Sequence, residues 1–324
     1  MKSKFVFWLL TTFLLTTAPV SEAQQAGKIF RIGYLDSGTA SGSAVLVKAF
    51  LQELTKLGWI GGKSFTIEYR FAEGKNDRLP ELAANLVRLK VDLIVVSGTP
   101  SARAAKSATT TIPIVMTTTT DPVGDGLVAS LARPGGNVTG FSSLGELNTK
   151  RLEILKDAVP KLTRVGLLRG SVAVPQLKDL RAAAPVLKLK LEEIETQLDA
   201  KGLESAFQTA KQKQVKAIMT TATRGFFSER KRIVELAVKY RLPAIYISKE
   251  FVDEGGLMSY GADYDDLYRK AAHYVDKILK GTKPADLPVQ QATKFEFIIN
   301  LKAAKQIGIT IPLGMLERAN QVIK

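Results

Sequence analysis

The stretch RIGYLDSGTASGSAVLVKAFLQELTKL (residues 31–57) opens with a short apolar run and continues as a longer amphipathic segment. In its second part, Val47, Phe50, Leu54 and Leu57 recur at the three- and four-residue spacing of one helix face. A short strand followed by a helix that covers a sheet face is the repeating unit of parallel α/β folds. The stretch therefore predicts the first strand and the first helix of such a sheet.

The same alternation continues in two series along the chain. Strands of the first series are expected at residues 31–35, 65–69, 92–96, 112–117 and 138–141. Strands of the second series are expected at residues 164–168, 191–195, 217–221 and 243–247, with further strands at 257–260 and 295–300. A chain of 324 residues is more than one core comfortably serves, so two lobes of roughly 120 to 150 residues are expected.

The C-terminal part is too short for a third domain. We expect it to cross back between the lobes and to complete both, which makes a hinge of several strands. Lobe 1 is predicted to contain residues 28–143 and about 260–285, and lobe 2 residues 147–258 and about 286–324.

The N-terminus has the layout of a secretory signal peptide. Lys2 and Lys4 precede an apolar run over residues 5–15, and Ser21 and Ala23 supply the small residues of a cleavage site. The run is shorter than the ~20 residues of a membrane-crossing helix, so we expect cleavage after residue 23; an uncleaved anchor is the alternative. The sequence has no cysteine, which excludes disulfides and a lipid-modified cysteine. A freely diffusing, monomeric periplasmic protein is expected.

The formal charge of +15, from 46 basic and 31 acidic residues, raises nucleic acid as a partner. The basic residues are, however, scattered among acidic ones, as in KRLE at residues 150–153. We expect a solvated basic surface and no nucleic-acid partner.

The sequence contains no recognised motif for a cofactor, a metal or a catalytic centre. The segment GWIGGKS (residues 58–64) has three residues between its outer glycines where a phosphate loop needs four, and it precedes a predicted strand; a helix C-cap and glycine turn is the better interpretation. Residues 36–42 lack the dinucleotide-binding glycine spacing. His273 is the only histidine, so no histidine pair exists for a metal or a proton relay. We expect no cofactor, no metal and no enzymatic activity.

Ligands of open parallel sheets bind at the carboxyl ends of the strands. In lobe 1 the residues at these ends that we select as ligand-binding candidates are Ser37, Gly38, Ser97, Gly98, Thr99, Ser101, Thr118 and Asp121. Thr99 is expected to be an N-cap with Pro100 at the first helical position, which leaves amides and hydroxyls for a carboxylate or merely caps the helix. Asp121 could hold an ammonium group or form a turn before Pro122.

In lobe 2 the candidates at the equivalent ends are Arg169, Thr221, Phe226, Phe251 and Tyr260. The three aromatic rings could form one wall of a pocket, or they could belong to the core, which is the commoner fate of such residues.

Several segments carry a family resemblance: DRLPELA (77–83), GTP (98–100) followed by AAK (104–106), TTTIPIV (109–115), DPV (121–123), RPGGNVTG (133–140) and EFV through GGLMSYG (250–261). They resemble the tryptophan-binding-protein-like family of ABC transporter substrate-binding proteins, from about Arg31 to the C-terminus. The resemblance implies a type I periplasmic-binding-protein fold with two Rossmann-like lobes and three crossover segments. It also implies delivery of a small-molecule ligand, an amino acid and possibly an aromatic one in characterised relatives, to an ABC permease in the inner membrane.

One loop departs from the family pattern. Relatives have an asparagine-proline-type loop after the strand at 164–168, whereas this chain continues with Arg169 and Gly170. If the loop faces the ligand, Arg169 is expected to favour a second acidic group. Two alternatives to solute transport remain: a sensory module for a membrane receptor, and a secreted α/β hydrolase with Asp121 or Glu250 as base.

Overall fold

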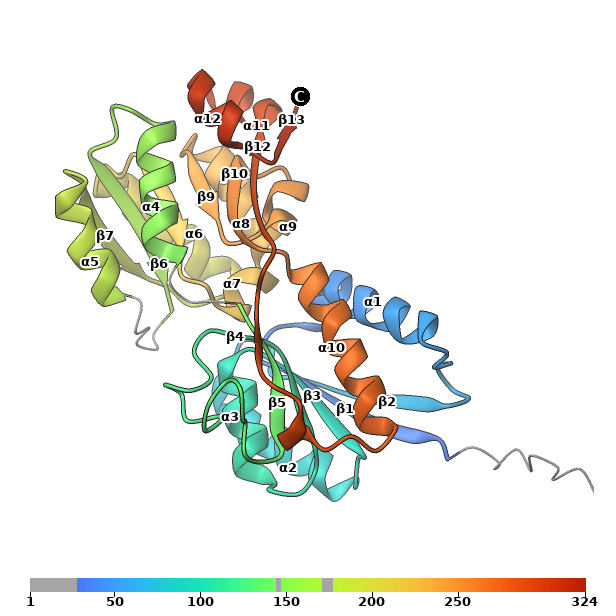
Figure 1. The fold of residues 1–324 in the computed structure, drawn as a ribbon. Helices are drawn as coiled ribbons and strands as arrows, with labels where there is room; N and C mark the ends of the chain where they lie inside the picture. The colour runs from blue at the N-terminus through green and yellow to red at the C-terminus, as the bar shows by residue number, and fades with distance from the viewer. Residues whose placement is uncertain (1–27, 144–146, 171–176) are drawn as a thin grey trace, which may run out of the picture.

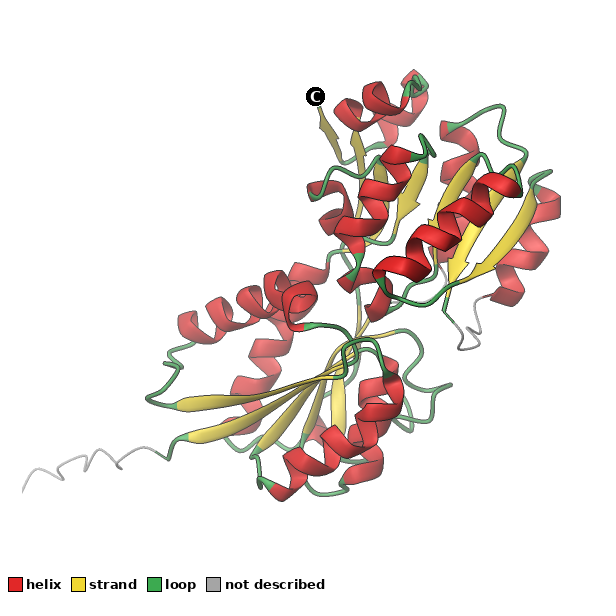
Figure 2. Cartoon of the chain, turned by 180° about the vertical axis from the view of Figure 1, so that it is seen from behind, coloured by secondary structure: helices red, strands yellow, loops and turns green. Residues whose placement is uncertain are grey.

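The computed structural model describes residues 28–143, 147–170 and 177–324. These residues fold into two α/β lobes, one above the other in Figure 1, and Figure 2 shows each sheet flanked by helices. The predicted signal peptide, residues 1–23, lies outside the described residues. Within the described ranges, no helix has the length and apolar character that crossing a membrane requires.

Lobe 1 contains a six-stranded sheet in the order β11-β5-β4-β3-β1-β2. Its strands are β1 (Phe30–Asp36), β2 (Phe65–Phe71), β3 (Leu93–Ser97), β4 (Ile114–Thr119), β5 (Val138–Ser142) and β11 (Gln290–Gln291). Its helices are α1 (Ala40–Lys56), η1 (Asn76–Arg78), α2 (Leu79–Arg88), α3 (Thr99–Ala108), α10 (Tyr264–Leu279) and η2 (Pro284–Asp286).

The period of two in strand β3 explains how this sheet is covered on both faces. Leu93 and Val95 belong to the same apolar cluster as Phe50 of α1, whereas Ile94 and Val96 pack in a separate cluster with residues of α2 and α3. Successive strand residues point to opposite faces. A continuous apolar run is therefore what a parallel strand buried on both sides requires.

Lobe 2 contains a seven-stranded sheet in the order β13-β12-β10-β9-β8-β6-β7, in which only the β10–β12 pair is antiparallel among the described strands. Its strands are β6 (Arg164–Arg169), β7 (Lys190–Glu195), β8 (Ala217–Thr220), β9 (Ala244–Tyr246), β10 (Met258–Ala262), β12 (Phe295–Asn300) and β13 (Gln321–Ile323). Its helices are α4 (Leu147–Ala158), α5 (Leu177–Val186), α6 (Ala200–Gln212), α7 (Arg224–Ser228), α8 (Arg230–Lys239), α9 (Lys249–Asp253), α11 (Leu301–Ile307) and α12 (Leu313–Arg318).

The chain passes between the lobes three times. Strand β5 ends in the first sheet before α4 begins in lobe 2, and β10 ends in the second sheet before α10 packs against α1. The third passage runs from β11 in the first sheet to β12 in the second, along the red segment in Figure 1. The sequence predicts the second and third passages at about residues 260 and 286. In the structure, the sheet pairings place the second passage just after Ala262 and the third between Gln291 and Phe295.

The predicted fold class, two parallel α/β lobes of the type I periplasmic-binding-protein kind, is confirmed. The glycine turn is confirmed as well, because α1 ends at Lys56 and Gly58 has a φ of +92°. The amide of Trp59 bonds to the carbonyl of Leu54, as expected when a glycine ends a helix. Strands β11 and β13 were not predicted, since two and three residues are too few to show a period.

At Gly140, strand β5 passes so close to β4 that only a residue without a side chain fits. The φ of Gly140 is +130°, and a Cβ there would overlap the backbone of Met116 in β4. We predict that Gly140→Ala lowers the free energy of unfolding by about 2–5 kcal/mol, the combined cost of backbone strain and overpacking. Gly136→Ala, where an added Cβ meets nothing within 4 Å, is the control. Equal urea midpoints for the two variants would contradict this account.

Candidate functional site

Direct contacts join the loop after β1 in lobe 1 to the helices after β8 in lobe 2. The amide of Thr39 donates to Oγ of Ser228 at 3.1 Å, and Nη1 of Arg230 donates to the carbonyl of Gly42 at 2.8 Å. The carboxyl ends of parallel strands from both sheets therefore meet where the lobes meet. We call this region the lobe junction.

A buried ion pair crosses the lobe junction. Nη2 of Arg224, at the start of α7, lies 3.1 Å from Oδ2 of Asp36, the last residue of β1, and these side chains are 5% and 0% exposed. Asp36 also accepts from the amide of Gly38 at 2.8 Å, the hydroxyl of Ser43 at 2.7 Å and the hydroxyl of Tyr34 at 3.1 Å. The carboxylate of Asp36 therefore accepts hydrogen bonds from three residues of its own lobe as well as from Arg224.

The surroundings of Arg224 also favour its charge. Burial by itself lowers the pKa of the guanidinium, but Asp36 and the hydroxyls of Tyr268 and Tyr34 raise that pKa overall. The guanidinium carbon lies 4.5 Å from the ring centre of Phe227, a cation–π geometry. The lobe junction is therefore held by a permanent charge pair.

Two tyrosines extend this network into lobe 1. The hydroxyl oxygens of Tyr34 and Tyr268 lie 3.2 Å apart, and that of Tyr268 lies 2.7 Å from Oγ of Ser97. Burial raises the pKa of Tyr34 well above its usual value, so this hydroxyl stays protonated. Ser97, predicted to contact a ligand, already has a partner here.

Other buried polar atoms at the carboxyl ends of the strands lack a partner. Among the described residues, these include Oγ1 of Thr99 and Oγ of Ser101 at the start of α3, Oγ1 of Thr220 and Thr221 at the end of β8, Nη1 of Arg224 in α7, and Oγ of Ser248 and Oε2 of Glu250 after β9. A buried polar atom without a hydrogen bond costs about 1–3 kcal/mol. Both lobes therefore present polar groups that a bound molecule could satisfy.

Glu250 is the acidic member of this set. It is 5% exposed, and burial raises the pKa of its carboxyl. Sequence analysis did not select Glu250 as a ligand-binding residue. It precedes the selected Phe251 by one position, and the sequence named it only as the possible base of a hydrolase.

The predicted helix start at Thr99 is wrong by one residue. Helix α3 begins at Thr99 itself, Gly98 is its N-cap with a φ of +84°, and Pro100 is the second helical residue. The reason is steric as well as conformational, because a Cβ at position 98 would lie 2.8 Å from Cγ of Arg224. Only glycine allows this approach without displacement.

The other predicted ligand-binding residues of lobe 1 differ in their burial and in their contacts. Ser37 and Thr118 are buried at the ends of β1 and β4, and a Cβ on Gly38 would overlap Oγ of Ser228. Asp121 is exposed, and its Oδ1 accepts from the amide of Gly124 at 2.8 Å. The turn, one of the two alternatives for Asp121, is the geometry observed.

In lobe 2, the predicted ligand-binding residue Arg169 forms ion pairs within its own sheet. Nη2 of Arg169 lies 2.9 Å from Oε2 of Glu195, and Nε lies 3.2 Å from Oε2 of Glu193, both on the neighbouring strand β7. The loop that follows, residues 171–176, lies outside the described residues.

The three aromatic candidates of lobe 2 make core contacts. Phe226 and Phe251 are fully buried, and Phe251 stacks on Tyr246 with ring centres 4.7 Å apart. Tyr260 packs edge-on against Phe297 of β12. Their role as a pocket wall stays a prediction. No group of three metal-ligating side chains is found within the described ranges.

Two α/β lobes that meet at the carboxyl ends of their strands define a type I periplasmic binding protein. Residues 41–323 match the family model for ABC transporter substrate binding proteins. The chain belongs to this family, as the sequence resemblance indicates.

Several known proteins are similar to this chain. The tyrosine-binding protein of Clostridioides difficile (strain R20291) is 30% identical over 265 residues, which cover 81% of this chain and 76% of that protein. A conserved domain protein from Vibrio cholerae is 31% identical with a TM-score of 0.82, covering 91% of this chain and 100% of that one. An ABC domain in complex with L-Trp from Streptococcus pneumoniae is 29% identical with a TM-score of 0.78, covering 90% and 100%.

A further solved relative bears on the arrangement of the lobes. A substrate binding protein from Clostridium difficile, described as ligand-free and open, is 26% identical with a TM-score of 0.61, covering 91% and 100%. The L-Trp complex has similar identity but a higher TM-score. In this structure the two lobes touch each other through the contacts of the lobe junction.

Ser97 and Ser101 provide a matched pair for testing the hydrogen-bond assignment. We predict that Ser97→Ala lowers the free energy of unfolding by about 1 kcal/mol, because the hydroxyl of Tyr268 loses the shorter of its two hydrogen bonds. Ser101→Ala is expected to leave stability unchanged or slightly higher, because its hydroxyl has no partner among the described residues. Urea denaturation of the ligand-free protein measures both, and a larger loss for Ser101→Ala would refute the assignment.

Proposed function

We propose that this protein captures an amino acid between its lobes in the periplasm and delivers it to an ABC permease of the inner membrane. The observation that carries the proposal is the set of unpaired, buried polar atoms that both lobes present at the lobe junction. One relative is named for tyrosine binding, and another was solved with L-Trp. Aromatic amino acids are therefore the proposed ligand class.

The two lobes offer opposite chemistry. Lobe 1 contributes the hydroxyls of Thr99 and Ser101 in the first turn of α3, a helix of ten residues, where helix N–H groups also favour an anion. Lobe 2 contributes the carboxyl of Glu250. The ligand's carboxylate would lie against α3 and its ammonium group against Glu250, with a charge-assisted hydrogen bond to each.

Most of the remaining residues predicted from the sequence are also proposed to line the ligand site, but Asp121 is not. Ser37, Gly38, Gly98, Thr118 and Thr221 lie at the ends of strands that meet at the lobe junction and are proposed to line the ligand site. Glu250 takes the place of Asp121 as the proposed ammonium partner, because the carboxylate of Asp121 already accepts from a backbone amide.

Capture is proposed to work by closure rather than by chemistry. A ligand that touches both lobes binds the closed state more tightly than the open one and shifts the population toward it. The permease would then recognise the closed surface. Export by the signal peptide at residues 1–23 is part of the same proposal, since the family acts on solutes outside the cytoplasm.

Isothermal titration with L-Tyr, L-Trp and L-Phe tests the ligand class, and analogues test its orientation. Glu250→Gln is expected to lower the affinity for the best-bound amino acid at least about tenfold, because a charge-assisted hydrogen bond to the ammonium group is lost. The affinity for the analogue that lacks the amino group should not change. Ser101→Ala should lower the affinity for the amino acid and for the analogue without the amino group. It should not change the affinity for the amine that lacks the carboxylate. Exposed Glu235 provides the control Glu235→Gln. If no amino acid binds, the ligand class is wrong.

Gly42→Ala tests closure separately from ligand contacts. An added Cβ would lie 2.5 Å from Cα of Ser228 across the lobe junction, whereas within α1 alanine favours the helix by about 1 kcal/mol. We predict a fold at least as stable as wild type, a loss of affinity of at least tenfold, and no ligand-induced decrease in radius of gyration by X-ray scattering. Gly314→Ala in α12, with nothing within 4 Å, is the control. Normal compaction of Gly42→Ala would contradict the closure mechanism.

A further inference from the structure

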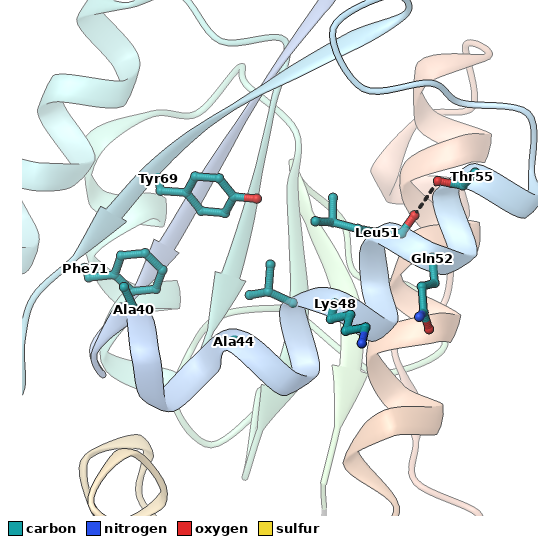
Figure 3. A pocket seen from close by; sticks show the side chains of 9 residues that line it. Ala40, Ala44, Lys48, Leu51, Gln52, Thr55, Tyr69 and Phe71 are labelled. Atoms are coloured by element: carbon teal, nitrogen blue, oxygen red, sulfur yellow. Dashed lines mark hydrogen bonds between the residues drawn. The ribbon is translucent and has the colours of Figure 1, made fainter.

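A cavity of about 500 Å³ lies within lobe 1, between α1 and the edge strand β2. Figure 3 shows Tyr69 and Phe71 of β2 on one side of this space and the side chains of α1 on the other. None of its lining residues is among the unpaired groups of the lobe junction. Its volume lies in the range of about 300–1,000 Å³ that is typical of small-molecule sites.

The sequence explains why this space is not filled. Ala40 and Ala44, four residues apart on α1, present only methyl groups toward the rings of Tyr69 and Phe71. β2 is the edge strand of the sheet, so no further strand extends the sheet beyond it. As a result, Tyr69 remains 38% exposed, a large apolar ring left in contact with solvent.

The floor of the cavity is flat and rigid. Tyr69 and Phe71 are two residues apart on one face of β2, with ring planes 8° apart and centres separated by 6.0 Å. Tyr34 of the neighbouring strand packs against each of them at 5.8 Å, and its hydroxyl is held by Asp36. The two rings are therefore supported from behind and offer a planar apolar surface to a ligand.

The lining has four polar side chains. Thr55 donates to the carbonyl of Leu51, and Oε1 of Gln52 accepts from Arg269. The other two, Tyr69 and Lys48, can donate a hydrogen bond to a ligand. The hydroxyl of Tyr69 points toward α1 in Figure 3, and burial raises its pKa, so that it stays protonated. Lys48 lines the cavity from α1 and is in no ion pair with another described residue, whereas Glu53 and Lys56 of the same helix pair with each other. The lining contains no Asp or Glu.

We infer that this cavity is a second binding site, for a small planar aromatic acid without an amino group. The aromatic body would lie against Tyr69 and Phe71, and the carboxylate would pair with Lys48. An amino acid is disfavoured because no lining side chain can compensate its ammonium group. This selectivity is the opposite of that proposed for the lobe junction, and the inference does not depend on it.

The test is titration of the full mature chain with 1-naphthoate, followed by calorimetry and saturation-transfer NMR. Ala44→Leu, which fills the cavity, is expected to abolish binding, and Val45→Leu, at an exposed position outside the lining, to leave it unchanged. Lys48→Gln should weaken 1-naphthoate at least about fivefold without affecting neutral 1-naphthamide, and Lys63→Gln is its control. Thermal unfolding establishes that each variant is folded.

Three results would overturn the inference. They are no binding of 1-naphthoate to the wild type, equal binding to wild type and Ala44→Leu, and equal loss of 1-naphthoate and 1-naphthamide affinity in Lys48→Gln. Displacement of 1-naphthoate by an amino acid that binds the lobe junction would also overturn it, because the probe would then occupy the other site.

Discussion

The ion pair between Asp36 and Arg224 is the buried charge contact that joins the two lobes. The two residues are 188 positions apart, one at the end of β1 in lobe 1 and the other at the start of α7 in lobe 2. Removing one partner from such a buried pair costs about 3–5 kcal/mol, because the other charge is left without compensation. Within lobe 1, hydrogen bonds from Tyr34 and Ser43 hold the carboxylate of Asp36 in place for this contact.

Small residues make this approach of the lobes possible. Added Cβ atoms on Gly38 and Gly42 would collide with Ser228, and one on Gly98 would collide with Arg224. All three glycines follow strands of the first sheet, where the chain turns into a helix. At these three positions, side chains of lobe 2 lie against nearly bare backbone of lobe 1, which favours close hydrogen bonds over apolar packing.

Helix α1 serves both of the sites described. Its first turn carries Gly42, which contacts lobe 2, while its adjacent face forms one side of the cavity above Tyr69 and Phe71. The two sites differ in chemistry because the lobe junction gathers hydrogen-bonding groups from many strand ends, whereas the cavity is formed by one helix and one edge strand with few polar side chains. A chain with one transport-related binding site can therefore carry a second site of different selectivity on the same lobe.

Sequence by itself determined the elements, the two lobes and the family, because periodicity and strand-end rules act locally along the chain. It also predicted that a ligand binds at the carboxyl ends of the strands, since parallel strands bring these ends to one side of a sheet. Only the tertiary structure decided which polar groups are already paired. Ser97 bonds to Tyr268, and Asp121 closes its own turn. Arg224 was identified only from its partners in the structure, and Glu250 became a candidate ligand partner only through its burial. Pairing and burial depend on partners far away in the chain, and no local pattern encodes them.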